Sequence, residues 1–410
     1  MKSGIGKVLG GGRLFGAEMR DDPYPIYREL RESDPVHWDD SLHAWILTRY
    51  DDVGLALNDP RFSSRRVSRA RQRFADPSLA PLFDTLAGRM SDHDEPDHKR
   101  LRALVHDAFL RTAVEKWTPR IQARIDLLLA AAEQRGTIDF IADFAVPLPL
   151  LVILEIVGVP ATDRVRVKAW CDDFAIVALN FYANISEAEL HNGLRSIVEF
   201  RQYLGERIGE LESSPRTDLL SSLVQVEHEG TRLTLDELLA NALLLLAAGN
   251  ETTTCVLGNG LAALLNHPEQ LELLRRNPSL IPAAVEEFLR YDSPVQFLGR
   301  IALEDVELRG QTIRRGDLVL AVLGAANRDP ARFAEPDRLD VTRAHVPHFA
   351  FGHGPHFCAG AQLARLEAQM AFAGLLARFR AIELDTTSPL VRRENFNIRC
   401  WEQLPVRLNV

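Results

Sequence analysis

Phe351-Gly-His-Gly-Pro-His-Phe-Cys-Ala-Gly360 is the most informative segment of this chain. It places Cys358 in a tight loop rich in glycine and proline, directly before an amphipathic helix predicted over Ala359–Phe379. Backbone N–H groups of such a loop and the positive end of the helix dipole favour a thiolate, the form of cysteine that binds a soft metal. The segment therefore predicts a metal-binding thiolate at the start of a helix.

The glycines and the ligand types of this loop narrow the choice of metal. Gly352, Gly354 and Gly360 permit positive φ values and allow the backbone to lie close to a flat ligand. A single thiolate suits haem iron better than zinc, which normally takes paired cysteines or i, i+4 histidines. Zinc stays open as a competing metal because three histidines lie nearby, namely His348, His353 and His356. A buried structural cysteine is the third interpretation.

The same segment resembles the haem-binding loop of the cytochrome P450 family, whose pattern is Phe-x-x-Gly-x-x-x-Cys-x-Gly. Phe351, Gly354, Cys358 and Gly360 fill the positions of this pattern. The resemblance implies haem b (iron protoporphyrin IX) as the cofactor and Cys358 as the proximal ligand of its iron. It also implies that the haem is contacted by further loop residues, namely Phe351, Gly352, His356 and Gly360.

A second motif, Ala248-Gly-Asn-Glu-Thr-Thr253, lies in a long helix predicted from Thr234 to about Asn266. Glycine inside a helix costs about 1 kcal/mol relative to alanine, and neighbouring threonines can open a groove or a π-bulge. The motif resembles the oxygen-activation segment of the family. By position, this resemblance implies that Ala248 lines the haem, that Glu251 is the proton-relay acid, and that the Thr252 hydroxyl helps deliver protons through water. A kinked helix with a surface acid is the alternative.

A third motif, Glu287-Phe-Leu-Arg290, matches the family pattern Glu-x-x-Arg. At i, i+3 the two side chains share one helix face and can pair. The resemblance implies a buried structural network completed by Arg338, which lies before Leu339 where the family usually has an aromatic residue. Breaking such a network costs roughly 3–5 kcal/mol, whereas a solvated pair contributes about 0–1 kcal/mol.

Cationic and donor side chains for the haem propionates are implied by the resemblance at four positions. His98 and Arg102 follow the family spacing His-x-x-x-Arg, and Arg300 and His356 match the other two positions. Charge-assisted hydrogen bonds from such groups would hold two carboxylates in a partly buried site. Taken alone, His98 and Arg102 are also compatible with an ordinary basic helix surface.

The substrate pocket implied by the resemblance is mostly small and apolar. It would be lined by Met90, Leu244, Ala247, Val295, Gln296, Leu298 and Phe396. Such a lining suits an apolar small molecule of the secondary-metabolite, terpenoid or steroid, fatty-acid or aromatic type. Each of these side chains could equally belong to the ordinary core.

Composition limits the class of protein. The 410 residues carry a net charge of −9, which argues against binding to nucleic acid or an anionic membrane. Four scattered cysteines, no signal peptide and no membrane-spanning segment indicate a cytoplasmic protein.

Helical periodicity dominates, so the fold class is mainly α with minor β. The resemblance implies the cytochrome P450 fold, with a long central helix over the haem and small β regions from both ends of the chain. We expect residues 1–20 to be a flexible arm and 21–410 to be one domain.

The reaction implied by the resemblance is that of a haem-thiolate monooxygenase. It would insert one oxygen atom from O2 into a C–H or C=C bond of an apolar small molecule. The chain has no flavin or iron–sulfur signature, so a ferredoxin and a ferredoxin reductase would supply the electrons, docking near Lys99, Arg100 and Arg365. The alternatives are a peroxide-driven or non-hydroxylating haem-thiolate enzyme and a non-catalytic haem sensor.

Overall fold

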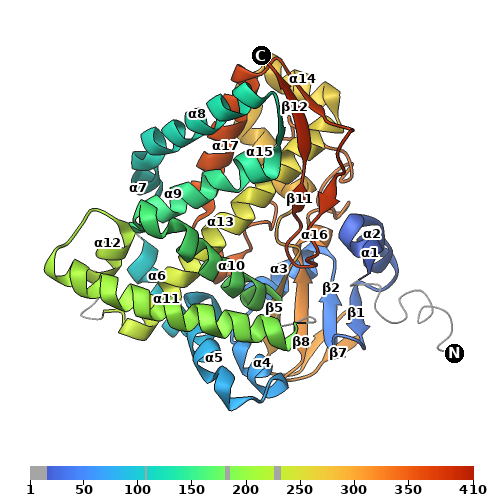
Figure 1. Cartoon of the computed structure of the whole chain (residues 1–410). Helices are drawn as coiled ribbons and strands as arrows, with labels where there is room; N and C mark the ends of the chain where they lie inside the picture. The colour runs from blue at the N-terminus through green and yellow to red at the C-terminus, as the bar shows by residue number, and fades with distance from the viewer. Residues whose placement is uncertain (1–15, 107–108, 181–184, 226–231) are drawn as a thin grey trace.

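The computed structural model describes residues 16–106, 109–180, 185–225 and 232–410. Helices form one large part of the molecule and small sheets lie along its other side (Figure 1). The predicted class, mainly α with minor β, is confirmed. The helices are α1 (Ala17–Asp21), α2 (Tyr24–Ser33), α3 (Tyr50–Asn58), α4 (Val67–Arg73), α5 (Ala80–Ala87), α6 (Asp97–His106), α7 (Arg111–Val114), α8 (Thr118–Arg135), α9 (Pro147–Val157), α10 (Arg164–Asn180), α11 (Glu187–Ser213), α12 (Leu219–Gln225), α13 (Leu235–Leu265), α14 (Pro268–Arg276), α15 (Ile281–Tyr291), α16 (Leu323–Ala326) and α17 (Ala361–Arg378).

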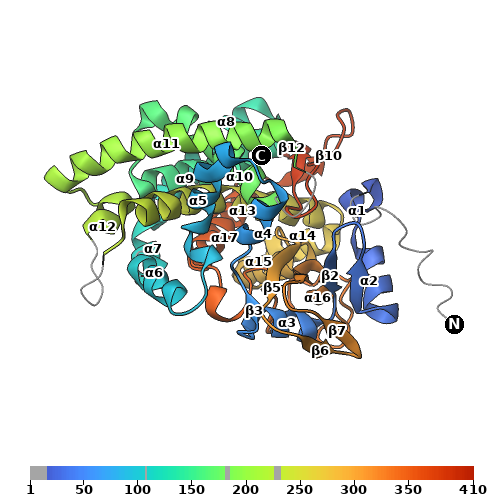
Figure 2. The same cartoon turned by 90° about the horizontal axis from the view of Figure 1, so that it is seen from below.

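The strands form four sheets in the described part of the chain. They are β1 (Val36–Asp39), β2 (Ala44–Leu47), β3 (Phe62–Ser63), β4 (Thr137–Asp139), β5 (Phe297–Ala302), β6 (Val306–Leu308), β7 (Gln311–Ile313), β8 (Leu318–Val322), β9 (Ala381–Leu384), β10 (Val391–Arg392), β11 (Trp401–Gln403) and β12 (Pro405–Asn409). The largest sheet has the order β1-β2-β8-β5-β3, with β2 and β8 parallel. It joins the first strands of the chain to strands beyond residue 296 (Figure 2).

Helix α13 is the central element, as the sequence predicts. Its start is fixed by a capping box in which the Thr234 side chain accepts from the Glu237 backbone and the Glu237 side chain accepts from the Thr234 backbone. The helix packs against α9, α10, α15 and α17, so most of its side chains are buried. In Figure 1 it crosses the middle of the molecule behind α10 and α11.

The π-bulge that the glycine and threonines of α13 could open does not form. The helix is continuously α-helical through Gly249, and a Cβ atom at this position would lie 3.1 Å from Cγ1 of Ile153 on α9. Glycine is therefore used here for close helix packing and not for a break in the hydrogen-bond ladder. A π-helical turn does occur in a segment that contacts α13, over Ile141–Ala145, directly before α9.

The N-terminal arm predicted over residues 1–20 lies mostly outside the described residues. The last residues of this arm belong to helix α1 (Ala17–Asp21), in which Met19 is buried. The Arg399 guanidinium donates to the backbone oxygens of Arg20 (2.8 Å) and Asp21 (3.1 Å), which fixes α1 to the C-terminal segment. None of the described helices combines the length and apolar character that a membrane crossing requires.

Candidate functional site

The Phe351–Gly360 loop is closed by backbone hydrogen bonds. The Cys358 N–H donates to the Phe351 oxygen at 2.9 Å, and Gly352 and Gly354 have φ values of +73° and +70°. A Cβ atom at Gly354 would lie 2.5 Å from Oδ1 of Asn58, so only glycine fits there. Gly360 does not use a positive φ, because its φ is −83°.

Cys358 differs from the other three cysteines of the chain. Its side chain is exposed, whereas Cys171, Cys255 and Cys400 are buried. The protein atoms around the sulfur raise the pKa of the Cys358 thiol, while backbone hydrogen bonds from Gly360 and Ala361 act in the opposite direction. The loop thus supplies the backbone donors that the sequence predicts. A bound cation would supply the charge that keeps this sulfur ionised.

The four predicted propionate-binding residues are brought together. The rings of His98 and His356 lie 3.9 Å apart between centroids, and Arg300 is buried. Burial, followed by the charges of Arg300 and His98, lowers the pKa of His356 to about 2, and Arg102 and Arg66 add to this effect. Sequence reasoning missed Arg66, which lies far from the motifs and shows no spacing signal.

This cation-rich cluster fits a doubly anionic ligand. Arg102 carries no ion pair with any described residue, and burial lowers its pKa. The low pKa of the His356 ring follows first from its burial and then from the positive groups that converge on it. Two carboxylates placed here would reverse that unfavourable electrostatic environment.

Zinc is not supported by the positions of the nearby histidines. Nε2 of His348 lies 3.2 Å from Glu286, and the ring of His353 packs at 5.3 Å from that of Phe349. Across the described residues, no three histidine, cysteine, aspartate or glutamate side chains are grouped so that they could hold a metal ion. The haem interpretation of the loop is the one that the donor set supports.

Helix α13 presents one uncovered row of side chains. Ala248 is exposed and Leu244 and Thr252 are half-buried, at spacings of four residues, on a helix that is otherwise largely buried. This i, i+4, i+8 spacing places the three on one face. Thr252 Oγ1 donates to the Ala248 oxygen at 3.0 Å. An apolar row with a single hydroxyl, together with the exposed thiol and the cation cluster, fits a flat apolar group with two carboxylates, which is the chemistry of haem.

Glu251 lies on the neighbouring face of α13, beside the C-terminal segment. Its carboxylate accepts a hydrogen bond from the Arg393 guanidinium. Burial opposes the charge of Arg393, but Glu251 together with the Cys400 and Cys255 sulfurs raises the pKa of the guanidinium. The structure therefore gives the predicted relay acid a cationic partner, which no motif in the sequence indicates.

The predicted substrate-lining residues fall into two groups. Met90 lies against α13, where its N–H donates to Asn241 Oδ1 at 2.9 Å, and Leu244 and Ala247 are on that helix. Leu298 is close to the haem loop, since a Cβ at Gly352 would lie 3.6 Å from its Cδ1 atom. Val295 and Phe396 form the second group. They pack against the clusters containing Ile398 and Tyr27, respectively.

Gln296 does not fit a substrate-lining role. It is 2% exposed, its Oε1 accepts from the Tyr27 hydroxyl at 3.0 Å, and its Nε2 donates to the Ser293 oxygen at 2.6 Å. Because its amide is fully used in joining α2 to the end of α15, we correct this prediction and assign Gln296 a structural role.

The Glu287–Arg290 pair is buried, as predicted. Both residues are 0% exposed, and Arg290 donates to both carboxylate oxygens at 2.7 Å. Further Arg290 donors reach the backbone oxygens of Asn327 (3.0 Å) and Pro336 (2.7 Å). The pair thereby connects α15 to the irregular segment that precedes the haem loop.

Arg338 is not the third member of this network, contrary to the prediction. Its guanidinium is 56% exposed and pairs with Glu335 and Asp340, and only its backbone oxygen accepts from Arg290. Arg343 takes the predicted place, with Nε at 3.1 Å from Glu287 Oε2. Leu339 is buried in the core, and the side chain of Arg338 before it lies at the surface.

Comparisons with known proteins agree with this geometry. The family model described as Cytochrome P450 matches residues 174–403. The polyketide biosynthesis cytochrome P450 PksS of Bacillus subtilis (strain 168) is 37% identical, covering 96% of this chain and 98% of the relative. The vitamin D(3) 25-hydroxylase of Pseudonocardia autotrophica is 41% identical, covering 96% of each. The crystal structure of P450BioI in complex with an acyl carrier protein ligated to hexadec-9Z-enoic acid has a TM-score of 0.90 at 37% identity, covering 96% and 99%. The chain belongs to the cytochrome P450 family.

Proposed function

We propose that this cytochrome P450 monooxygenase inserts one oxygen atom from O2 into a C–H or C=C bond of a polyketide-, steroid- or fatty-acyl-like small molecule. The observation that carries this proposal is the uncovered row Leu244, Ala248 and Thr252 on α13, which offers an apolar surface with one hydroxyl. Similar proteins support these substrate classes, because their names refer to polyketide biosynthesis, to vitamin D(3) and to a fatty acid on its carrier protein.

The residues of the chain have separate roles in this proposal. Haem b, when bound, supplies the iron at which O2 is activated, with Cys358 as its ligand and with propionates held by His98, Arg102, Arg300 and His356. Thr252 would hold a water molecule and orient protons on the α13 face. Glu251, which is paired with Arg393, would pass protons from solvent towards that water. Delivery through two positioned groups limits how much water reaches the reacting centre.

Electrons would come from a ferredoxin and its reductase, docking on the side of the haem loop. Of the three cations predicted to bind the ferredoxin, Lys99 is exposed. Arg100 pairs with Glu237, and Arg365 donates to both oxygens of Glu286 at 2.7 and 2.9 Å. Because these two arginines already have carboxylate partners, we assign the main electrostatic contribution to Lys99.

Location and domain organisation complete the proposal. The four free cysteines support a cytoplasmic protein. One hydrophobic cluster runs from Val67 to Leu408, and the sheet β1-β2-β8-β5-β3 joins the segment before it to the later chain, which supports a single domain over residues 21–410.

The test is turnover with isotopically labelled oxygen. We first select apolar compounds that shift the iron from low to high spin. We then supply NAD(P)H, ferredoxin, reductase and ¹⁸O2, and expect products that contain one ¹⁸O atom. A peroxide-driven assay runs in parallel.

The two arms separate the candidate functions. Product that forms only with peroxide would establish the peroxide-driven alternative. Spin-shifting ligands without product in either arm would indicate a sensor. The Lys99→Glu variant should slow ferredoxin-driven turnover and leave the peroxide arm unchanged.

A further inference from the structure

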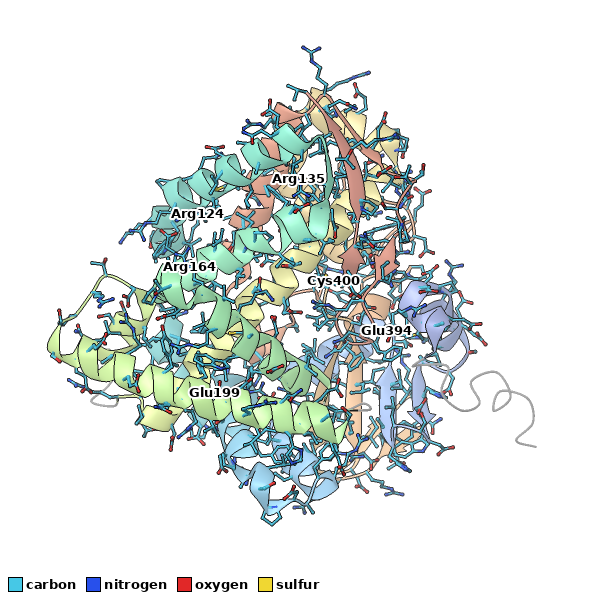
Figure 3. All side chains as sticks on the ribbon, viewed as in Figure 1. Arg124, Arg135, Arg164, Glu199, Glu394 and Cys400 are labelled. Atoms are coloured by element: carbon cyan, nitrogen blue, oxygen red, sulfur yellow. The ribbon has the colours of Figure 1, made fainter. Side chains whose placement is uncertain are left out.

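Two buried thiols meet where the C-terminal segment crosses α13. Cys255 is 0% and Cys400 is 2% exposed, and together with Ile398 they form a small cluster separate from the main core. Cys255 lies one turn after Glu251 on α13, and Cys400 directly precedes β11. Figure 3 labels Cys400 at this crossing. Neither the proposed haem site nor the proposed relay uses these thiols.

The thiols interact with each other and with the groups around them. Burial raises the pKa of Cys255, and a hydrogen bond with the Cys400 thiol adds to the rise. Cys255 Sγ also donates to the Glu251 oxygen at 3.0 Å. The Arg393 guanidinium is close enough to both sulfurs to act on Cys255 in the opposite direction. The two thiols thus lie together beside the ion pair of Arg393 and Glu251.

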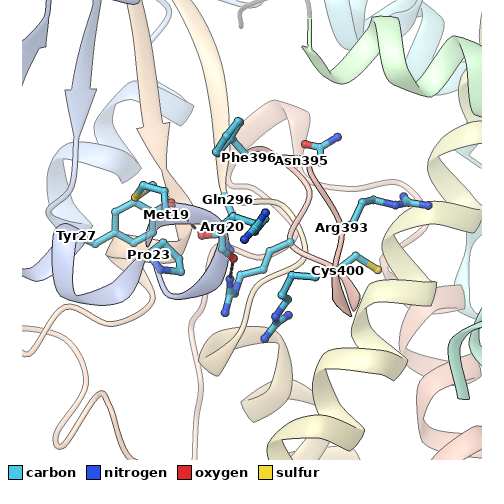
Figure 4. Close-up of a pocket in the computed structure, with 11 residues that line it drawn as sticks. Met19, Arg20, Pro23, Tyr27, Gln296, Arg393, Asn395, Phe396 and Cys400 are labelled. Atoms are coloured by element: carbon cyan, nitrogen blue, oxygen red, sulfur yellow. Dashed lines mark hydrogen bonds between the residues drawn. The ribbon is translucent and has the colours of Figure 1, made fainter. Parts of the chain in front are cut away.

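Cys400 is the cysteine of this pair that borders a small pocket. It lines a pocket between α1, α2 and the C-terminal segment, together with Arg393, Phe396 and Gln296. Figure 4 shows Cys400 and Arg393 next to each other on one side of this pocket. The free space is about 10 Å³, which is room for about one water molecule. An oxidant that acts here must therefore be close to water in size.

We infer that Cys255 and Cys400 form an oxidisable dithiol that hydrogen peroxide converts into a disulfide. The Cys400 sulfur loses its proton and attacks one peroxide oxygen, an S–O bond forms as the O–O bond breaks, and one water leaves. The Cys255 sulfur then displaces the oxygen from Cys400, an S–S bond forms and a second water leaves. Two thiols lose two electrons and two protons, and one peroxide is reduced to two waters.

The disulfide would change the surroundings of Glu251. It would link α13 to the segment that carries Arg393, the partner of the Glu251 carboxylate. Motion of that segment relative to the helix would then be restricted. A loss of coupled turnover after oxidation follows only if Glu251 is the relay acid, so this consequence rests on the proposed function. The disulfide itself does not.

Peptide mapping tests the inference without any activity measurement. The purified holoprotein is treated with graded hydrogen peroxide, alkylated, and digested with trypsin without reductant. Trypsin releases Cys255 in residues 233–275 and Cys400 in residues 400–407, each as the only cysteine of its peptide. We expect a linked pair of these peptides that is lighter by two hydrogens than their sum and is separated by dithiothreitol.

Matched variants make the result specific. Cys400→Ser and Cys255→Ala should each abolish the linked pair. Cys171→Ser, which removes a buried cysteine outside this cluster, should leave it unchanged. The inference is overturned if no linkage between Cys255 and Cys400 appears at peroxide doses that already oxidise Cys358. It is also overturned if the peroxide-treated wild type gives only higher oxides of Cys400.

Discussion

Replacing Glu287 by glutamine should lower the free energy of unfolding by roughly 3–5 kcal/mol, because a buried ion network would lose its only anion. Arg290 and Arg343 both direct guanidinium donors at this carboxylate, and the Asp340 N–H donates to it at 3.0 Å. Glutamine keeps the shape but leaves the buried positive charges uncompensated. The measurements are the urea midpoint and the haem bound per protein.

A pair of arginine variants sharpens this test. Arg343→Met removes a partner that is 13% exposed and should approach the effect of the glutamine variant. Arg338→Met removes an arginine that is 56% exposed and should change the free energy of unfolding by less than about 1 kcal/mol. Equal losses for the two methionine variants, or a larger loss for Arg338→Met, would contradict the assignment of Arg343.

Replacing Thr252 by alanine should reduce the product formed per NAD(P)H consumed by on the order of 10²-fold, the lower end of what a positioned proton-transfer group contributes. The reducing equivalents should then leave as hydrogen peroxide. The hydroxyl lies on the uncovered face of α13 and bonds only within its own helix turn, so its loss should not disturb folding. Product, cofactor consumption and peroxide are measured together.

The serine variant is the control for this hydroxyl. Thr252→Ser keeps the Oγ atom and should retain most of the coupling, whereas alanine should not. If the alanine variant forms product with the coupling of the wild type, Thr252 has no part in proton delivery. A shift of its urea midpoint together with the loss of coupling would instead indicate a packing defect.

Local chemical signals in the sequence predict much of this fold. The helices that begin after Ser186 and Thr234 both start with a capping box, in which a hydroxyl residue and a glutamate three positions later bond each other's backbone N–H. The Glu-x-x-Arg spacing places Glu287 and Arg290 on one helix face, and they pair. These predictions succeed because the interacting groups lie within one turn of each other.

The errors lie where distant segments meet. Arg338 and Arg343 both precede the haem loop, and only the inward direction of Leu339 decides which guanidinium reaches Glu287. Arg393, the partner of Glu251, is more than 140 positions away, and no local spacing connects the two. Gly249 is a further example. A glycine is needed there because Ile153 of another helix packs against it, and the sequence does not show this contact. Tertiary contacts of this kind are not encoded in local periodicity.

The absorption spectrum of the ferrous–CO complex tests most directly whether Cys358 is the ligand of a haem iron. If the Cys358 thiolate is the ligand of a haem iron, the wild-type protein should show the long-wavelength Soret band of thiolate ligation, and so should Cys171→Ser. Cys358→Ser should lose this band, or lose the haem. A wild-type protein without the band, or a Cys358→Ser protein that keeps it, would contradict ligation of the haem iron by Cys358.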